Sequence, residues 1–275
     1  MDSYLTLLIV PLLCVPIQNL YLASGQRYDL GSITYIATGT LLAAQFTDPS
    51  ARQQTTLLLV LLIVLSIVAY LARCFILATG SPKDFTLFTF GQAWAVSAVV
   101  GYEIEQNSQD GGSGVYVHLF QNLTLPIALA SLLFAILTTA LLVRSRISLR
   151  LVAFTEAPLQ YRFVFGSLWW LAWRIETCAL LLYVVAGVAF RFVISDISGQ
   201  TFGVESLWCL LSAAVIGRNW QMWVVCGPIA VTVARLFANQ FVDSQYSLLL
   251  VYSLLALCLA IVNFNAKRAS REITG

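Results

Sequence analysis

The chain has 275 residues, of which 59% are hydrophobic and only 10% are charged, and its formal net charge is +2. A soluble domain of this size carries roughly a quarter charged residues, and so small a positive charge gives no basis for binding nucleic acid. The composition therefore excludes an ordinary soluble protein and predicts a single all-α polytopic membrane domain over residues 1–275.

Hydropathy along the chain predicts a series of apolar helices separated by short loops. We expect nine segments, near residues 4–23, 31–46, 55–78, 85–102, 124–143, 173–194, 202–217, 220–241 and 246–264. Segments 31–46 and 202–217 are short for a crossing of roughly 20 residues, so each either spans fully or re-enters. The prediction is therefore about eight or nine transmembrane or re-entrant helices.

Lysine and arginine in short loops set the predicted orientation. Loop 144–166 contains four arginines, and the tail 265–275 contains three basic residues, so both are expected in the cytoplasm. Loop 103–114 contains three acidic residues and no basic one, so it is expected outside. Nine spans satisfy all three constraints, with the N-terminus outside and the C-terminus in the cytoplasm.

The two short segments suggest an internal repeat. One begins at Gly31 and the other at Gly203, and each is followed by a long span and a further span. Five spans between their starts would invert the second unit relative to the first, which is typical of transporters whose pathway lies at the repeat interface. The alternative is that any two apolar triplets look alike.

Few ionisable residues fall inside the predicted spans. Four arginines lie near span ends, from which their side chains are expected to extend to the headgroups: Arg73, Arg174, Arg191 and Arg235. Glu176 is two residues from Arg174, which places them on different sides of a helix. The membrane region is therefore expected to be packed and mostly neutral.

The chemistry of an enzyme is not indicated by the sequence. His118 is the only histidine, no two of the six cysteines form a Cys-x-x-Cys pair, and no Gly-rich loop for ATP phosphates occurs. Metal sites need several converging His, Cys or carboxylate ligands. We therefore expect no catalytic residue, no metal and no cofactor.

Loop 144–166 has an amphipathic sequence that Pro158 interrupts, because residues before a proline are pushed out of the helical region. Two short helices with a bend between them could dock into a groove on a soluble partner. An inert helix at the membrane surface fits the residues equally well.

A family resemblance bears on that choice. The run "RLVAFTEAPLQYRFVFG" (150–166), followed by "LLLYVVAGVAF" (180–190), resembles permease subunits of the branched-chain amino acid and urea type of ABC importer. The C-terminal run 210–261 is similar to that family's glycine turn, Gly-Pro span start and last span. The stretch "SGQRYDLGSITYIATGTLLAAQ" (24–45) is similar to the turn that enters a short pathway helix.

The resemblance implies two inverted repeats of the type II-like ABC permease fold, in a bacterial inner membrane. It implies that loop 144–166 is a coupling helix for ATP-binding subunits, at Arg150, Glu156, Ala157, Pro158, Arg162 and Gly166. It places a translocation pathway along Gly31, Ser32, Thr38, Gly39, Glu205 and Ser212. The implied partners are ATPase subunits, a second permease (homologue or identical copy), a periplasmic or lipid-anchored solute-binding protein and membrane lipids, with no nucleic acid.

Two points stay open at this stage. Small residues in the pathway segments serve either close helix approach or space for a solute. The function is either transport of a small solute, driven by ATP hydrolysis on separate subunits, or a non-transport role as a membrane scaffold or assembly protein. The scaffold is favoured by the scarcity of polar groups within the predicted spans.

Overall fold

The computed structural model describes residues 29–47, 49–79, 81–109, 115–116, 124–144, 168–191 and 196–197, together with isolated positions at 9, 12–13, 17–18, 21, 150, 229, 233, 237, 240, 253 and 257. This part of the chain is helical apart from one ladder of two short strands. The predicted segments 4–23, 202–217, 220–241 and 246–264 lie outside it, apart from the isolated positions, as do the second repeat and the tail 265–275.

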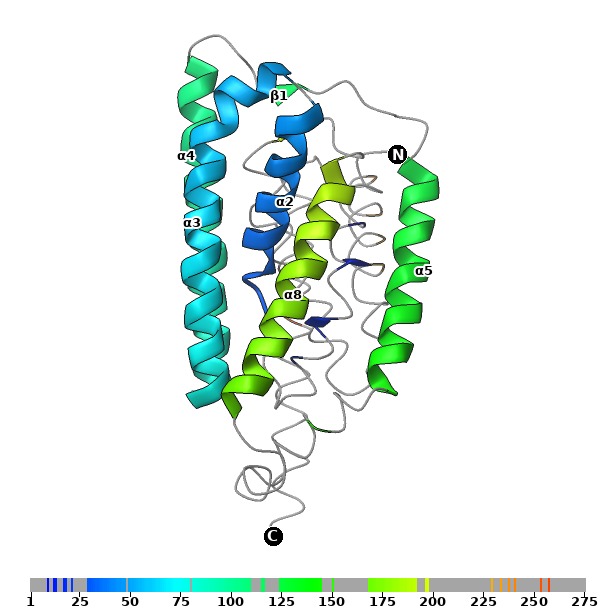
Figure 1. Ribbon diagram of the computed structural model, residues 1–275. Helices are drawn as coiled ribbons and strands as arrows, with labels where there is room; N and C mark the ends of the chain where they lie inside the picture. Colours follow the sequence, from blue (N-terminus) through cyan, green and yellow to red (C-terminus); the bar gives the residue numbers. More distant parts are fainter. Residues whose placement is uncertain are drawn as a thin grey trace.

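The described part of the chain has five helices, and successive ones run in alternating directions (Figure 1). Their bounds are α2 (Ser32–Thr47), α3 (Pro49–Thr79), α4 (Pro82–Gln109), α5 (Thr124–Val143) and α8 (Leu168–Arg191). Helices α2, α3, α4 and α8 pack together as a bundle, and α5 lies to one side of it. Each of the five helices overlaps a predicted segment, which confirms that these five segments are helices. The bounds of α5 match the prediction, whereas α3 begins before residue 55 and α4 continues beyond residue 102.

Helices α3 and α8 are long and apolar enough to cross a membrane, over Thr55–Thr79 and Leu168–Arg191. Only 33% of the most apolar stretch of α3 is buried inside the bundle. Its outer face exposes large apolar side chains, including Leu57, Val60, Val64, Val68 and Leu71. An apolar face of this extent suits contact with lipid rather than with water.

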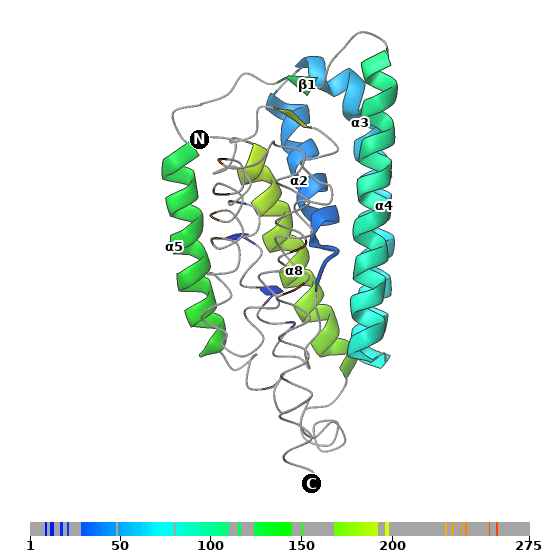
Figure 2. The ribbon, with the colours of Figure 1, turned by 180° about the vertical axis from the view of Figure 1, so that it is seen from behind.

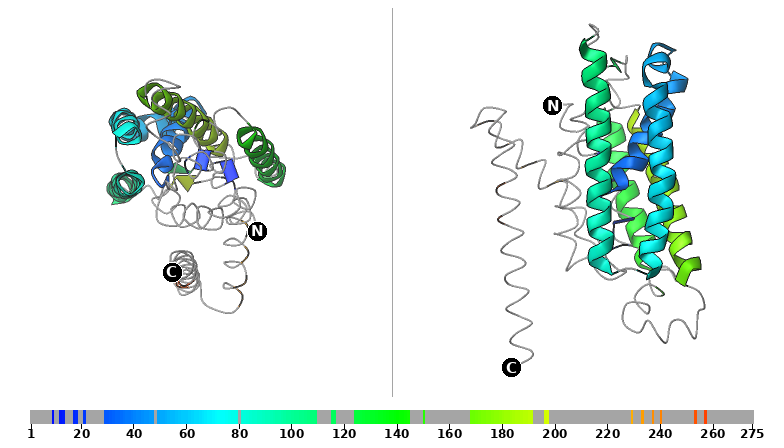
Figure 3. Two further views of the ribbon diagram at one scale, coloured as in Figure 1. Left: turned by 90° about the horizontal axis from the view of Figure 1, so that it is seen from below. Right: turned by 90° about the vertical axis from the view of Figure 1, so that its left-hand side faces the viewer.

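Helix α2 is the central helix of the described bundle (Figure 3). Every residue from Ser32 to Leu41 is buried, and α2 packs against α3, α4 and α8. It begins part-way along α3 rather than at its end, as both faces of the bundle show (Figures 1 and 2). The N-terminus of α2 therefore lies inside the bundle.

A short antiparallel ladder joins two loops at one end of the bundle. Strand β1 (Val115–Tyr116) pairs with β2 (Asp196–Ile197), with Val115 opposite Ile197. Because β1 follows α4 and β2 follows α8, these two helices end on the same side. If nine spans alternate across the membrane, the loop after α4 and the loop after α8 must also lie on the same side.

The turn between α3 and α4 shows why α4 begins where it does. The Ser81 hydroxyl donates to Asp84 Oδ2 at 2.7 Å, and the Ser81 N–H donates to the same oxygen at 2.9 Å. The Asp84 N–H returns a bond of 3.3 Å to Ser81 Oγ. These reciprocal bonds satisfy N–H groups that the first turn leaves without helical partners, and Pro82 is pre-set for the first helical position.

This cap gives a pH-dependent prediction. The hydrogen bonds from Ser81 lower the pKa of Asp84 below its ordinary value. A lowered carboxyl pKa adds stability above the ordinary pKa, and that contribution is lost as pH falls through the lowered value. We expect Ser81→Ala to lower the thermal midpoint of the detergent-solubilised protein at neutral pH, with the difference from wild type shrinking on acidification to roughly pH 3. A difference that is constant over this range would show that the Asp84 charge contributes nothing.

Candidate functional site

A buried cluster of charges joins three parts of the chain that are far apart in sequence. Arg73 of α3 donates from Nε to Glu176 Oε2 of α8 at 2.9 Å, and from Nη1 to Asp29 Oδ1 at 2.9 Å. Asp29 lies just before α2. All three side chains are 0% exposed. We call these residues, together with Tyr21 and Tyr183, the Arg73 cluster.

The two tyrosines complete the hydrogen bonding of the Arg73 cluster. Tyr21 OH donates to Glu176 Oε1 at 2.6 Å and accepts from Arg73 Nη2 at 2.9 Å. Tyr183 OH donates to Asp29 Oδ2 at 3.0 Å. Each guanidinium nitrogen and each carboxylate oxygen therefore has a partner, which is the condition under which charges can be buried at all.

Aromatic rings enclose the guanidinium of Arg73. Its Cζ lies 5.4 Å from the ring centre of Tyr21, 5.3 Å from that of Tyr35 and 5.3 Å from that of Phe85. A cation within about 6 Å of an aromatic face is attracted by the ring quadrupole. The rings also exclude water, and in the resulting low dielectric both the attraction within the cluster and the cost of disturbing it are larger than in water.

The start of α2 is built into this cluster. The Gly31 N–H donates to Asp29 Oδ1 at 3.1 Å, so the carboxylate holds the turn that opens the helix. From α4, Gln92 Nε2 donates to the Gly31 carbonyl at 3.0 Å and to Thr34 Oγ1 at 2.8 Å. A Cβ at Gly31 would collide with Gln92 Oε1. Only glycine therefore allows Gln92 to lie this close to the start of α2.

The expectation of a mostly neutral interior is wrong for the described part of the bundle. The side chain of Arg73 does not extend to the headgroups, because Asp29 and Glu176 hold it inside, and Arg191 is also only 2% exposed. Glu176 pairs with Arg73 rather than with Arg174. Arg174 is exposed, with its Cζ 4.9 Å from the ring centre of Trp170.

The predicted pathway residues of α2 are all buried. Thr38 Oγ1 donates to the Thr34 carbonyl at 2.8 Å and lies 2.9 Å from Ser66 Oγ of α3. Ser32 Oγ and Gln92 Oε1 are buried, and neither has a hydrogen-bond partner in the described part of the chain. Two buried polar atoms close to the start of α2 therefore have no hydrogen-bond partner among the described residues.

Gly39 serves the contact between α2 and α8. A Cβ at Gly39 would collide with the Val184 carbonyl, and a Cβ at Gly187 would collide with the Ile36 carbonyl. Thr40 Oγ1 donates to the Gly187 carbonyl at 3.0 Å across the same crossing. Of the two uses that the sequence leaves open for small residues, Gly39 therefore serves close helix approach in this conformation.

The remaining predicted site residues are mostly outside the described part of the chain. This holds for Glu156, Ala157, Pro158, Arg162 and Gly166 of the coupling loop and for Glu205 and Ser212 of the pathway. Arg150 is described and exposed. The structure brings Gly31, Ser32, Thr38 and Gly39 together along α2.

Sequence reasoning missed the roles of Asp29, Arg73 and Glu176. Arg73 lies less than two turns from the C-terminal end of α3, where a long side chain can point either to the surface or inward. Glu176 was the better signal, because a short acidic side chain within an apolar helix cannot reach the headgroups as an arginine does. Asp29 stood out only as part of a turn before a short helix.

Compared with models of protein families, with curated proteins and with solved structures, the chain shows no match.

Proposed function

We propose that this chain is a transmembrane subunit of a solute transporter, with the Arg73 cluster and the start of α2 at the centre of its pathway. The observation that carries this proposal is the enclosed trio of Arg73, Asp29 and Glu176. Ionisable residues inside a membrane bundle are expensive, and they mark substrate or ion pathways and proton relays. Replacing a buried ion pair with well-packed apolar side chains is often neutral or stabilising, so packing alone does not require these charges.

The position of α2 supports the same proposal. A helix that begins inside the bundle presents its N-terminal N–H groups and the positive end of its dipole to the interior. Transporters bind solutes at such interrupted helices. Here the Asp29 carboxylate occupies the N-terminus of α2 and the Arg73 guanidinium lies against it. A solute carboxylate or amide could exchange with these partners when the bundle opens.

The same observation weakens the scaffold alternative. That alternative drew its support from the scarcity of polar groups within the predicted spans, and the Arg73 cluster removes this support. A structural role for the cluster remains the competing explanation, and the two differ in whether water and solute ever reach it.

The finer proposal concerns the energy source and the location. We propose a multi-pass protein of the bacterial inner membrane, with the N-terminus outside, whose loop 144–166 couples to ATP-binding subunits and which pairs with a second permease. The resemblance of residues 150–166 and 180–190 to ABC permeases supports this proposal. The alternating directions of the five helices are compatible with it.

Co-purification tests the coupling. Wild-type protein, solubilised in mild detergent, is expected to bring down an ATPase, and Glu156→Arg is expected to lose it, because the reversed charge would disrupt docking of the coupling helix. Glu103→Arg is the matched control, since it makes the same change in the last two turns of α4, at the opposite end of the bundle, and should retain the ATPase. Equal recovery with both variants, or no ATPase with wild type, would contradict the coupling role.

A further inference from the structure

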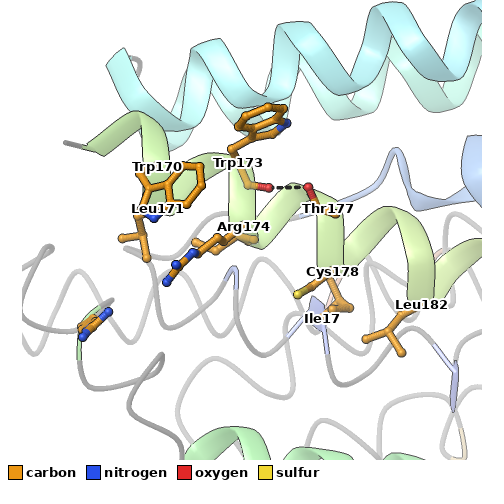
Figure 4. Close-up of a pocket in the computed structure, with 10 residues that line it drawn as sticks. Ile17, Trp170, Leu171, Trp173, Arg174, Thr177, Cys178 and Leu182 are labelled. Carbon is orange, nitrogen blue, oxygen red and sulfur yellow. Dashed lines mark hydrogen bonds between the residues drawn. The ribbon is translucent and has the colours of Figure 1, made fainter.

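A groove runs along α8 from Trp170 to Leu182 (Figure 4). None of its described lining residues belongs to the Arg73 cluster. Its volume is about 500 Å³. The described residues that line it are Ile17, Arg150, Trp170, Leu171, Trp173, Arg174, Ile175, Thr177, Cys178 and Leu182. They include two guanidinium groups and no carboxylate, and most of the others are apolar.

The lining residues are ordered along the helix. Leu171, Arg174, Cys178 and Leu182 follow one another at spacings of three or four residues, which places them on one face of α8. In Figure 4 the Arg174 side chain extends from α8 at the Trp170 end of the groove, while Cys178 and Leu182 continue along it. The groove therefore has a cationic end near the start of α8 and an apolar end farther along the helix.

The cationic end is suited to a phosphate group. The Arg174 guanidinium lies with its Cζ 4.9 Å from the ring centre of Trp170, a stacking that leaves the N–H edge available for bidentate bonds to phosphate. Arg150 lines the same groove from the predicted coupling loop.

We propose that this groove binds an anionic phospholipid, with the phosphate of the headgroup on Arg174 and an acyl chain along Leu171, Cys178 and Leu182. Charge complementarity selects an anionic lipid over a zwitterionic one. Trp170 and Trp173 are 56% and 52% exposed, as is usual for tryptophans at the headgroup level. The arginine-rich side of the membrane, to which this end of α8 is assigned, is also where basic pockets bind anionic headgroups.

Lipid binding by purified protein tests the proposal, which depends on a membrane location but not on transport. Wild type in detergent would be titrated with phosphatidylglycerol or phosphatidylcholine, and bound lipid counted by native mass spectrometry. We expect wild type to prefer phosphatidylglycerol, and Arg174→Gln to weaken that binding about fivefold, as for one basic side chain at an anionic membrane surface.

The matched control is Arg144→Gln, which removes an exposed arginine next to the end of α5 that does not line the groove. It should bind phosphatidylglycerol as wild type does. Equal binding of the two lipids, or an equal loss with Arg144→Gln, would overturn the proposal in favour of general surface electrostatics. Competition by inorganic phosphate alone as strong as that by the lipid would show a free-anion site instead. Loss of a co-purifying protein from Arg174→Gln, without lipid preference in wild type, would assign the groove to a protein partner and also overturn it.

Discussion

Arg73→Leu is expected to lower the free energy of unfolding by about 3–5 kcal/mol, because it leaves the buried carboxylates of Asp29 and Glu176 without their cation. The Tyr21 hydroxyl also loses the hydrogen bond that it accepts from Arg73 Nη2. The turn that opens α2 should also be less well held, because the Asp29 carboxylate that accepts from the Gly31 N–H would lose its bond to Arg73. The measurement is the thermal midpoint of detergent-solubilised protein, followed by fluorescence-detected size exclusion after heating.

Two variants bracket this result. Arg73→Lys keeps the charge but cannot donate to both carboxylates in the planar geometry of a guanidinium, so we expect an intermediate midpoint. Arg144→Leu removes an exposed arginine beyond α5 and should change stability by less than about 0.5 kcal/mol. If Arg73→Leu were as stable as Arg144→Leu, the cluster would not be buried as described.

Gly39→Ala is expected to destabilise the bundle by about 1–3 kcal/mol, the usual cost of forcing extra atoms into a packed contact. The added methyl group would meet the Val184 carbonyl of α8, which is backbone and cannot turn aside as a side chain could. Gly187→Ala should act in the same way against the Ile36 carbonyl. Both changes separate α2 from α8. They should therefore also disturb the Arg73 cluster, because Asp29 lies just before α2 and Glu176 lies on α8.

Gly91→Ala is the matched control for the glycine prediction. Gly91 lies within α4, and a Cβ there would meet nothing within 4 Å. Because alanine is favoured over glycine in a helix interior by about 1 kcal/mol, this variant should be slightly more stable than wild type. Thermal midpoints of Gly39→Ala and Gly91→Ala that shift in the same direction would contradict the close crossing of α2 and α8.

The helices were predictable because their signal is local. The apolar run at 124–143 gave the bounds of α5. The start of α4 was predicted near residue 85, three residues late, because hydropathy alone does not register the capping bonds between Ser81 and Asp84. Bounds were less accurate where polar residues extend a helix beyond its apolar core. The first turns of α3 and the last turns of α4 are such extensions.

The Arg73 cluster was not predictable because it depends on contacts between distant segments. Arg73 is separated by 44 residues from Asp29 and by 103 from Glu176. Spacing within α8 correctly separates Glu176 from Arg174, but it says nothing about a third residue on another helix. The use of Gly39 was open for the same reason, since only the position of α8 distinguishes a helix crossing from space for a solute.

The proposed transport function requires the interior around the Arg73 cluster to open to water. Ser32→Cys, in a chain whose six native cysteines are replaced, places a thiol at a fully buried position at the start of α2. Val64→Cys, on the apolar outer face of α3, is the control for a thiol shielded by lipid. We would measure the reaction of both with a membrane-impermeant thiol reagent in cells and in inverted vesicles. Labelling of Ser32→Cys from at least one side, with Val64→Cys unreactive, is the result expected for a transporter; a Ser32→Cys thiol that stays unreactive from both sides would show that the cluster is only structural.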